Sequence, residues 1–428
     1  MVDDSRLSRL QVRGDLNPTP VDEIQLQAGV GELWRDDGAG TGGNPVRSLG
    51  NEDAHVSLRW QRQLAPDEQF QLRFVHERER PIDRFIAVQG AVRAVADSGG
   101  RSQRTELGLQ HSLRLDPSLR LAWGGEWRHE TAASPGLYFI SDTISLHQWR
   151  VFGNLEWRPH PQWLLQAGGT HEGHSYTGSA LSPRLTANFH VLPDHTLRAG
   201  VTRSVRAPTF YELRGDTRFY SITAPSTQVA WTFLSSGTVK PETLISHELG
   251  YLGRFRDLGL TLDARAFLER MNNRIWFSAR RVGAFTPNDA VNRPGPHIHG
   301  FEYQVDWRPF AATRLLLAEA HTRAERGDAN ETREMPFRNS TLTWLQQLPY
   351  ALEFSAIYTT ATSYQWAGGG ETINKPRRLD LRLGKTFAFG ATRGELSITA
   401  QGVDGGHSVY KVGQRFDRRS FATLRLDF

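Results

Sequence analysis

The sequence contains no cysteine, which excludes both a disulfide framework and a thiolate metal site. It also has no apolar run approaching the about 18 consecutive residues that a membrane-spanning helix requires. The start, MVDDSRLSRLQ, lacks a basic segment followed by an apolar core, so it shows no secretory signal. The absence of a long apolar run excludes a helical membrane protein.

Lysine is nearly absent as well. Of 51 basic residues only four are lysine, namely Lys240, Lys375, Lys385 and Lys411, and the rest are arginine. Acidic residues interleave with the arginines along the whole chain, so no basic stripe points to a nucleic-acid partner. The 12 Trp, 10 Tyr and 22 Phe residues are spread over the full length, which argues against disorder.

What the sequence does have is alternation with a period of two. In GFEYQVDWRP, Phe301, Tyr303, Val305 and Trp307 fall on one face of a strand and charged or amide side chains on the other. The same pattern recurs in segments from Ile24–Val30 to the closing SFATLRLDF. The sequence therefore predicts an all-β protein.

The connections between these strands fall into two alternating sets. One set is short and rich in turn formers, such as LAPDE, LDPS and RPHPQ. The other set is long and polar and covers residues 35–51, about 79–104, 129–146, 204–242, 271–297, 322–337, 362–376 and 402–419. This layout, with Trp157, Trp163, Trp307 and Tyr350 beside short turns, predicts an antiparallel up-and-down β-barrel of the bacterial outer membrane with about 19 strands. A soluble propeller is disfavoured because no blade-length repeat is present.

One stretch carries a family signature. SVRAPTFYELRGDTRFY is followed by GTVKPETLISHELGYLGRF, and the matching residues are Arg206, Ala207, Pro208, Tyr211, Glu212 and Leu213, then Pro241, Glu242, Thr243, Glu248, Leu249 and Gly250. This combination resembles the barrel signature of TonB-dependent outer-membrane receptors. We expect Pro208 and Pro241 to end the ladder, because proline lacks the N–H donor. Arg206 and Glu212 are expected to pair and brace the segment between the prolines rather than to touch a ligand.

The resemblance covers residues 1–428 and implies a barrel of about 22 strands, of which about 18–20 are present here. Counting back from the last strand, the first runs from the long-loop side towards the turns, so at least one strand is expected to be missing. The family's signal peptide, TonB box and plug have no counterpart in this sequence, and we expect a partial receptor barrel. The implied function is energy-coupled uptake of a ferric siderophore or similar metal chelate, without enzyme activity. A plug-free diffusion channel and, less favoured, an outer-membrane barrel enzyme are the alternatives.

Candidate ligand-binding residues are aromatic and arginine side chains of the long loops, which suit stacking and contacts with an anionic chelate. They are Arg214, Arg218, Tyr220, Trp231, Trp276, Arg280, Tyr364 and Trp366. Haem is disfavoured, since residues 209–240 contain no histidine. The HEGH and HIH motifs lack a convincing third ligand, and no metal or other cofactor site is expected.

The C-terminal strand gives a last expectation. By the family resemblance, Leu424, Leu426 and Phe428 form a lipid-facing row that the barrel-assembly machinery reads. The other implied partners are outer-membrane lipid and lipopolysaccharide, a small-molecule chelate, and the TonB complex in a form that carries the plug. The implied localisation is the outer membrane of a Gram-negative cell.

Overall fold

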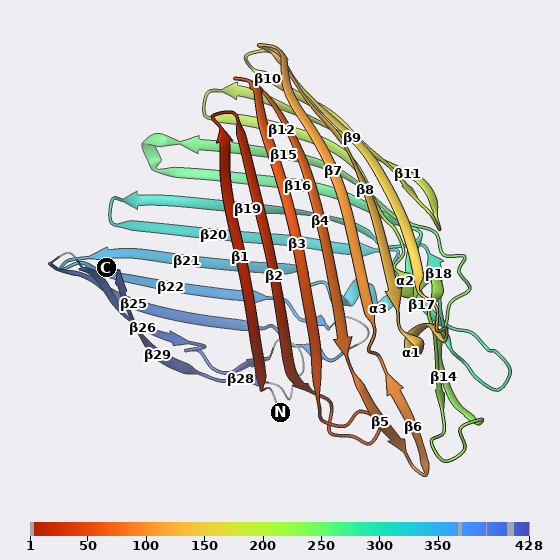
Figure 1. Ribbon diagram of the computed structural model, residues 1–428. Coiled ribbons are helices and arrows are strands. Elements are labelled where there is room, and N and C mark those ends of the chain that lie inside the picture. Colours follow the sequence, from red (N-terminus) through yellow and green to blue (C-terminus); the bar gives the residue numbers. More distant parts are fainter. Residues whose placement is uncertain (1–3, 367–369, 391, 409–414, 428) are drawn as a thin grey trace.

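A computed structural model describes residues 4–366, 370–390, 392–408 and 415–427. It consists of a single large antiparallel sheet of 19 strands that curls into the wall of a barrel, with smaller sheets and short helices at one end (Figure 1). The predicted all-β barrel and the predicted strand number are both confirmed. The described part of the chain has no helix long and apolar enough to cross a membrane.

Each wall strand pairs with its neighbours in the wall in chain order. The 19 strands are β1 (Ser5–Thr19), β2 (Asp22–Asp37), β3 (Arg47–Ala65), β4 (Glu68–Ile82), β7 (Arg101–Asp116), β8 (Leu119–Ala133), β9 (Ile144–His160), β10 (Trp163–His174), β11 (Gly178–Leu192), β12 (His195–Arg206), β15 (Glu242–Phe255), β16 (Leu260–Asn272), β19 (His297–Phe310), β20 (Thr313–Glu325), β21 (Arg338–Leu348), β22 (Leu352–Ala361), β25 (Arg377–Phe389), β26 (Thr392–Gln401) and β29 (Arg419–Asp427). Among the described residues, no backbone pairing joins β1 to β29.

Alternation assigns the two faces of the wall. Tyr303 lies opposite Ala264 of β16, and Trp307 lies opposite Leu260, so apolar side chains share one face across the strands. The other face carries ion pairs such as Arg314 with Asp306 at 2.7 Å. Because a membrane barrel turns its apolar face to lipid, the first face is the outward one and the second lines the lumen.

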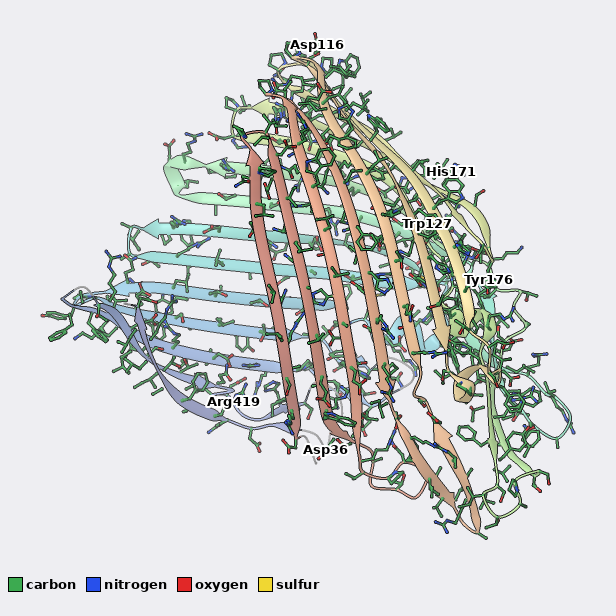
Figure 2. All side chains as sticks on the ribbon, viewed as in Figure 1. Asp36, Asp116, Trp127, His171, Tyr176 and Arg419 are labelled. Carbon is green, nitrogen blue, oxygen red and sulfur yellow. The ribbon has the colours of Figure 1, made fainter. Side chains whose placement is uncertain are left out.

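The two ends of the wall differ as the sequence predicts. Short turns join β1 to β2, β3 to β4 and the corresponding later pairs at one end, the turn end; Asp116 lies at this end and Asp36 at the other, the loop end (Figure 2). Trp157 and Trp307 near the turn end are 47% and 41% exposed, as expected for an aromatic girdle. The strands reach further into the loop end than predicted, since β4 continues to Ile82 and β3 begins at Arg47. Outside the membrane, extending the hairpin ladder satisfies backbone groups that a loop would leave to water.

The long loops contain secondary structure of their own. The smaller strands are β5 (Arg84–Gln89), β6 (Val92–Asp97), β13 (Asp216–Tyr220), β14 (Gln228–Leu234), β17 (Arg274–Ala279), β18 (Asn288–Arg293), β23 (Tyr364–Gln365), β24 (Thr372–Ile373), β27 (His407–Ser408) and β28 (Arg415–Phe416). The helices are α1 (Pro135–Tyr138), α2 (Phe210–Arg214) and α3 (Ala329–Glu334), with the 3-10 turn η1 (Arg256–Leu258).

Strands β13, β14, β18 and β17 form a four-stranded sheet at the loop end, which we name the rim sheet. It brings together two long loops, 207–241 and 273–296, and lies beside α1 and α2 (Figure 1). Its core consists of Leu213, Phe233, Val239, Ile275 and Ala290. The rim sheet is therefore a small packed unit with its own core, in contrast to a set of independent loops.

The last strand places Leu424 opposite Leu396 and Leu426 opposite Gly394 of β26. Leu424 and Leu426 are exposed on the outward face together with Ile398, as expected for a lipid-facing row. Phe428 lies outside the described residues.

Candidate functional site at the loop end

The signature segment forms the corner between β12 and the rim sheet. Pro208 is buried and ends β12, and Thr209 then caps α2. The Thr209 hydroxyl accepts a hydrogen bond from the Glu212 N–H at 3.2 Å, and the Glu212 carboxylate accepts one from the Thr209 N–H at 2.7 Å. This reciprocal capping box satisfies two backbone donors that a five-residue helix would otherwise leave unpaired.

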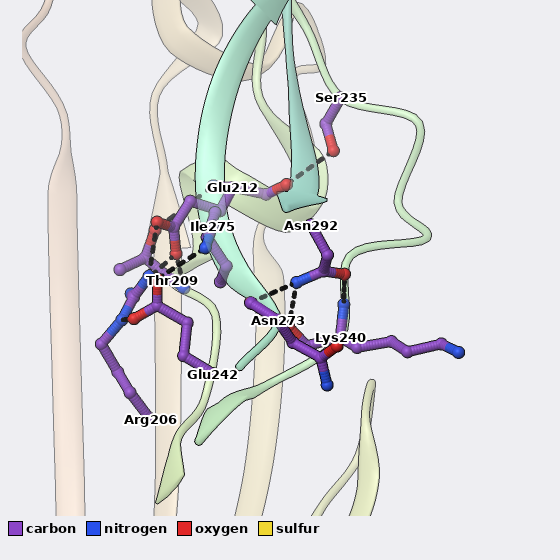
Figure 3. A network of polar contacts seen from close by, with 9 residues as sticks. All are labelled: Arg206, Thr209, Glu212, Ser235, Lys240, Glu242, Asn273, Ile275 and Asn292. Atoms are coloured by element: carbon purple, nitrogen blue, oxygen red, sulfur yellow. Dashed lines mark hydrogen bonds and ion pairs between the residues drawn. The ribbon is translucent and has the colours of Figure 1, made fainter. Parts of the chain in front are cut away.

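Arg206 lies between two carboxylates at the end of β12 (Figure 3). Its two terminal nitrogens donate to the two oxygens of Glu212 at 3.0 and 3.1 Å, and its Nε donates to Glu242 on β15. The other oxygen of Glu242 accepts the Ile275 N–H of β17 at 2.6 Å. One guanidinium thus connects two wall strands, α2 and the rim sheet.

Asn292 makes a second connection on the same side (Figure 3). Its amide group donates to the carbonyl oxygens of Lys240 at 2.9 Å and Asn273 at 2.7 Å, and its oxygen accepts the Lys240 N–H at 2.7 Å. Ser235 donates to the carbonyl oxygen of Glu212 at 2.7 Å. The hydrogen bonds between Asn292 and Lys240 join the two loops to each other, while Arg206 and Glu242 join them to the wall.

The Glu212 carboxylate stays charged in this setting. Burial alone would raise its pKa, but the hydrogen bonds from Arg206 and from Thr209 outweigh burial and hold the pKa below its ordinary value. The negative charge of the Glu212 carboxylate therefore helps to hold α2 in position.

The remaining signature residues pack. Leu213 belongs to the rim core, and Tyr211 stacks on Phe233 with 4.3 Å between ring centroids. The Tyr211 hydroxyl and the Thr217 hydroxyl lie 2.9 Å apart, and burial raises the pKa of Tyr211. Ala207 and Pro241 are half-buried beside them. Tyr211 and Leu213 thus pack the signature segment against the rim sheet.

Three of the candidate ligand residues, Arg218, Tyr220 and Trp231, lie together in the rim sheet. The Arg218 guanidinium is sandwiched between Phe139 at 4.3 Å and Trp231 at 4.2 Å. Asp216 accepts from Arg218 at 2.9 and 2.7 Å and from the Trp231 indole N–H at 2.8 Å. Tyr220 stacks on the same Phe139 with 5.8 Å between ring centroids. This assembly presents an aromatic and arginine surface that is held rigidly in place.

The other candidates are placed differently. Arg280 pairs with the buried Asp289 at 3.0 Å, and Trp276 lies against the guanidinium groups of Arg274 and Arg293 at 4.8 and 5.8 Å. Arg214 is exposed at the end of α2.

Tyr364 and Trp366 are not part of the rim sheet. They belong to the β23–β24 hairpin of another loop. The structure therefore brings six of the eight candidates to α2 and the rim sheet, which are Arg214, Arg218, Tyr220, Trp231, Trp276 and Arg280.

Four residues that organise the site were not found by sequence reasoning, namely Thr209, Asp216, Asp289 and Asn292. For Thr209 a signal was available, since Thr209 and Glu212 have the spacing of a capping box. Asp289 accepts a hydrogen bond from Ser236 and Asn292 one from Lys240, both on the other loop, so no local pattern predicts these contacts. The described residues contain no group of three or more His, Asp and Glu side chains that could hold a metal ion.

The curled 19-stranded sheet, with an apolar outward face, a charged lumen and a structured loop end, defines an outer-membrane β-barrel. The family model described as TonB dependent receptor-like, beta-barrel, matches residues 3–404, and the chain belongs to that family. It resides in the outer membrane.

Relatives and solved structures agree with this assignment. An iron-regulated outer membrane virulence protein of Vibrio cholerae serotype O1 is 30% identical over 141 residues in one strain, which is 31% of this chain and 20% of the relative. In a second strain that protein is 26% identical over 229 residues, which is 49% of this chain and 33% of the relative. The chain thus spans a third or less of the length of these relatives.

Among solved structures, the siderophore receptor PirA from Acinetobacter baumannii has a TM-score of 0.77 at 13% identity, over 99% of this chain and 71% of its own. The copper transporter OprC has a TM-score of 0.73 at 12% identity, over 99% of this chain and 72% of its own. A mutant ferric enterobactin receptor of Pseudomonas aeruginosa in complex with enterobactin has a TM-score of 0.64 at 13% identity, over 99% of this chain and 78% of its own. At such identities the likeness concerns the fold.

Proposed function

We propose that residues 1–428 act as the barrel domain of an outer-membrane receptor whose loop end binds an anionic metal chelate of the ferric siderophore kind. Energy-coupled uptake then involves the TonB complex, acting on a plug domain seated in the barrel. The barrel-assembly machinery is the proposed partner for insertion, and it reads the strand that carries Leu424 and Leu426. The named ligands of the structural neighbours, among them enterobactin, support the ligand class.

The observation that carries the proposal is the charge of the two loops that form the rim sheet. Residues 207–241 and 273–296 contain seven arginine or lysine residues and three acidic ones. All three acids are already paired, Glu212 with Arg206, Asp216 with Arg218 and Asp289 with Arg280. The positive charge that remains faces the cell exterior.

Four of the remaining cations, Arg214, Lys240, Arg281 and Arg293, are exposed side chains. Arg214, Lys240 and Arg281 form no ion pair within the described part of the chain. Arg214 and Lys240 flank Arg218 and Trp231 in sequence, and Arg281 closely follows β17 of the same rim sheet. Arginine and aromatic groups together suit a flat, anionic chelate better than a neutral one.

The test is a titration of the detergent-folded protein with ferric chelates of different charge, followed through tryptophan fluorescence. The wild type is expected to prefer an anionic tris-catecholate over a neutral hydroxamate chelate. The triple variant Arg214→Ser, Lys240→Ser, Arg281→Ser should bind the anionic chelate at least about tenfold more weakly. Arg256→Ser at the turn end is the control and should change nothing. Equal binding by the triple variant, or preference for the neutral chelate, would overturn the proposal.

A further inference from the structure

Two stacked histidines lie on the outward face of the wall, near the loop end of β8 and β9. His129 and His147 are directly opposite each other in the register of these strands. Their ring centroids are 4.5 Å apart, and the ring planes differ by 13°. The two residues come from neighbouring strands, so no short sequence motif contains both. We name them the imidazole pair.

The imidazole pair lies just beyond the apolar band of the wall. Trp127 and Trp149 are opposite each other two positions nearer the turn end, and they are 41% and 44% exposed. On the opposite, lumen face of the same two strands, Arg150 donates to Glu126 at 2.6 Å. Exposed tryptophans at this height suit the aromatic girdle at the outer boundary of the hydrocarbon layer. The pair is therefore on the water side of that boundary, where a dissolved ion can reach it.

Contacts that leave the ring nitrogens unused hold the pair in place. The Trp127 ring lies against both imidazoles, with centroids 6.1 Å from His129 and 6.3 Å from His147. The backbone N–H of His147 donates to the Ser175 hydroxyl at 3.3 Å, and the Ser175 N–H donates to the carbonyl oxygen of His147 at 3.0 Å. Stacking and backbone bonds thus fix the two side chains.

The ring nitrogens of the pair are available to a ligand. Among the described residues, neither imidazole takes part in a hydrogen bond or an ion pair. Other outward histidines are engaged, since the His76 Nδ1 lies 2.9 Å from the Thr105 hydroxyl and the His111 Nε2 lies 2.9 Å from Glu68. Neutral imidazole is the commonest nitrogen ligand of transition-metal ions in proteins.

The surroundings of the pair do not repel a cation. The outward side chains directly beside it and one row further out are neutral and polar, namely Gln103, Thr105, Thr131, Ser145 and Ser175. The adjacent arginines of the two strands, Arg128 and Arg150, belong to the lumen face and pair with glutamates there. Hydroxyl and amide groups can instead hold the water molecules of a bound ion.

The separation of the two rings suits one shared ion. Two imidazole nitrogens that bind one ion at about 2.0–2.1 Å lie about 3–4 Å from each other. Ring centroids at 4.5 Å are close to this spacing, so small rotations about the side-chain bonds convert the stack into a chelate.

The histidine motifs of the sequence do not meet this condition. His171 and His174 of HEGH are three positions apart on β10 and therefore fall on opposite faces. His297 and His299 of HIH share a face, but same-face neighbours along one strand are about 7 Å apart. A pair across two strands is closer than either motif allows.

We propose that the imidazole pair binds one divalent transition-metal ion, with His129 and His147 as the two protein ligands and water in the other positions. Two protein ligands agree with the lack of any group of three or more ligating side chains in the described part of the chain. Imidazole favours Cu²⁺, Ni²⁺ and Zn²⁺ over Mg²⁺ and Ca²⁺, and Cu²⁺ should bind most tightly. The site is on the outside of the wall and does not depend on the chelate proposed for the rim sheet.

The experiment adds less than one equivalent of Cu²⁺ to the full chain in detergent micelles and records electron paramagnetic resonance, which reports coordinated imidazole nitrogens. Wild type is expected to show two. His129→Gln and His147→Gln should each leave at most one and bind Cu²⁺ at least about tenfold more weakly, because the chelate is lost. His171→Gln removes another exposed outward histidine, on β10, and is the matched control that should behave as wild type.

The mobility of unheated samples on gels checks that each variant is folded. An unchanged spectrum and affinity in His129→Gln and His147→Gln would overturn the proposal. An equal loss in His171→Gln would place the ion elsewhere and overturn it as well. Displacement of Cu²⁺ by millimolar Mg²⁺ would indicate an oxygen site, which also contradicts the imidazole pair.

Discussion

The Arg206 guanidinium holds both oxygens of the Glu212 carboxylate, at 3.0 and 3.1 Å, while its Nε contacts Glu242. This contact joins the end of the wall strand β12 to the helix α2, which comes directly before the rim sheet in the chain. A lysine at position 206 would keep the charge and lose the planar fork that serves two carboxylates at once. The pair is thus a structural connection between wall and rim, and its removal should act on the rim first.

For Arg206→Lys we expect faster amide hydrogen exchange in residues 209–241 by about tenfold, equivalent to about 1.4 kcal/mol of local opening free energy. Exchange in the wall strands β19 and β20 should stay as in wild type. Arg214→Lys, which changes an exposed arginine at the other end of α2, is the control. Uniform acceleration over the whole barrel would contradict a local role.

The capping box predicts a smaller, separable effect. Thr209→Ala removes the side-chain acceptor for the Glu212 N–H and should cost about 1 kcal/mol of the stability of the loop 207–241. Thr209→Ser keeps the hydroxyl and should behave nearly as wild type. Limited proteolysis of the folded barrel measures the difference. Because Thr209 and Arg206 both contact Glu212, the double variant should show less than the sum of the two effects.

These contacts show what the sequence can and cannot predict. The faces of Phe301, Tyr303 and Trp307 followed from a period of two, because a wall between lipid and lumen imposes that period on every strand. The signature residues around Arg206 were found because they lie close together in the chain. The fold of the wall was therefore predictable in detail.

The rim sheet was not predictable in the same way. Its strands come from two loops, and β14 meets β18 through a single parallel pair, Phe233 with Asn288. The hydrogen bonds that Asp289 accepts from the Ser236 N–H and Asn292 from the Lys240 N–H depend on that meeting. The sequence made Arg218 a candidate ligand-binding residue. In the structure its guanidinium instead donates to Asp216, which lies two residues earlier on the same face of the strand. The two-residue spacing of Asp216 and Arg218 was a local signal for this ion pair, and the sequence reasoning did not use it.

Acid should loosen the rim sheet. The folded pKa of Glu212 lies below its ordinary value of 4.5, so its contribution to stability is fully present above that value. The contribution is lost as the pH falls through the ordinary value towards the folded pKa. Hydrogen exchange of residues 209–241, corrected for the intrinsic effect of pH, should therefore rise below about pH 4.5. Glu212→Gln should be less protected at pH 7 and show a weaker dependence on pH; an unchanged acid response in this variant would assign the loosening to other groups.

The rim core predicts that this unit unfolds separately from the wall. Leu213 is 3% exposed among Phe233, Val239, Ile275 and Ala290. Leu213→Ala should cost the rim sheet about 2–4 kcal/mol through lost burial and the cavity left behind. The wall should stay folded, as judged by the mobility of unheated samples on gels, while protease cleaves within residues 207–241. Loss of the folded barrel band would show that rim and wall form one cooperative unit.

Asp216→Asn tests whether the rim attracts anions through its net charge. The change removes one negative charge and weakens the pair with Arg218, while the stacking of Arg218 between Phe139 and Trp231 can persist. Association of an anionic ferric chelate, followed by quenching of tryptophan fluorescence after rapid mixing, should be about two- to threefold faster at low salt. The gain should disappear at high salt because the charges are then screened. Asp257→Asn, at the turn end, should leave the rate unchanged. A gain that persists at high salt would indicate a changed direct contact with the chelate rather than stronger long-range electrostatic attraction.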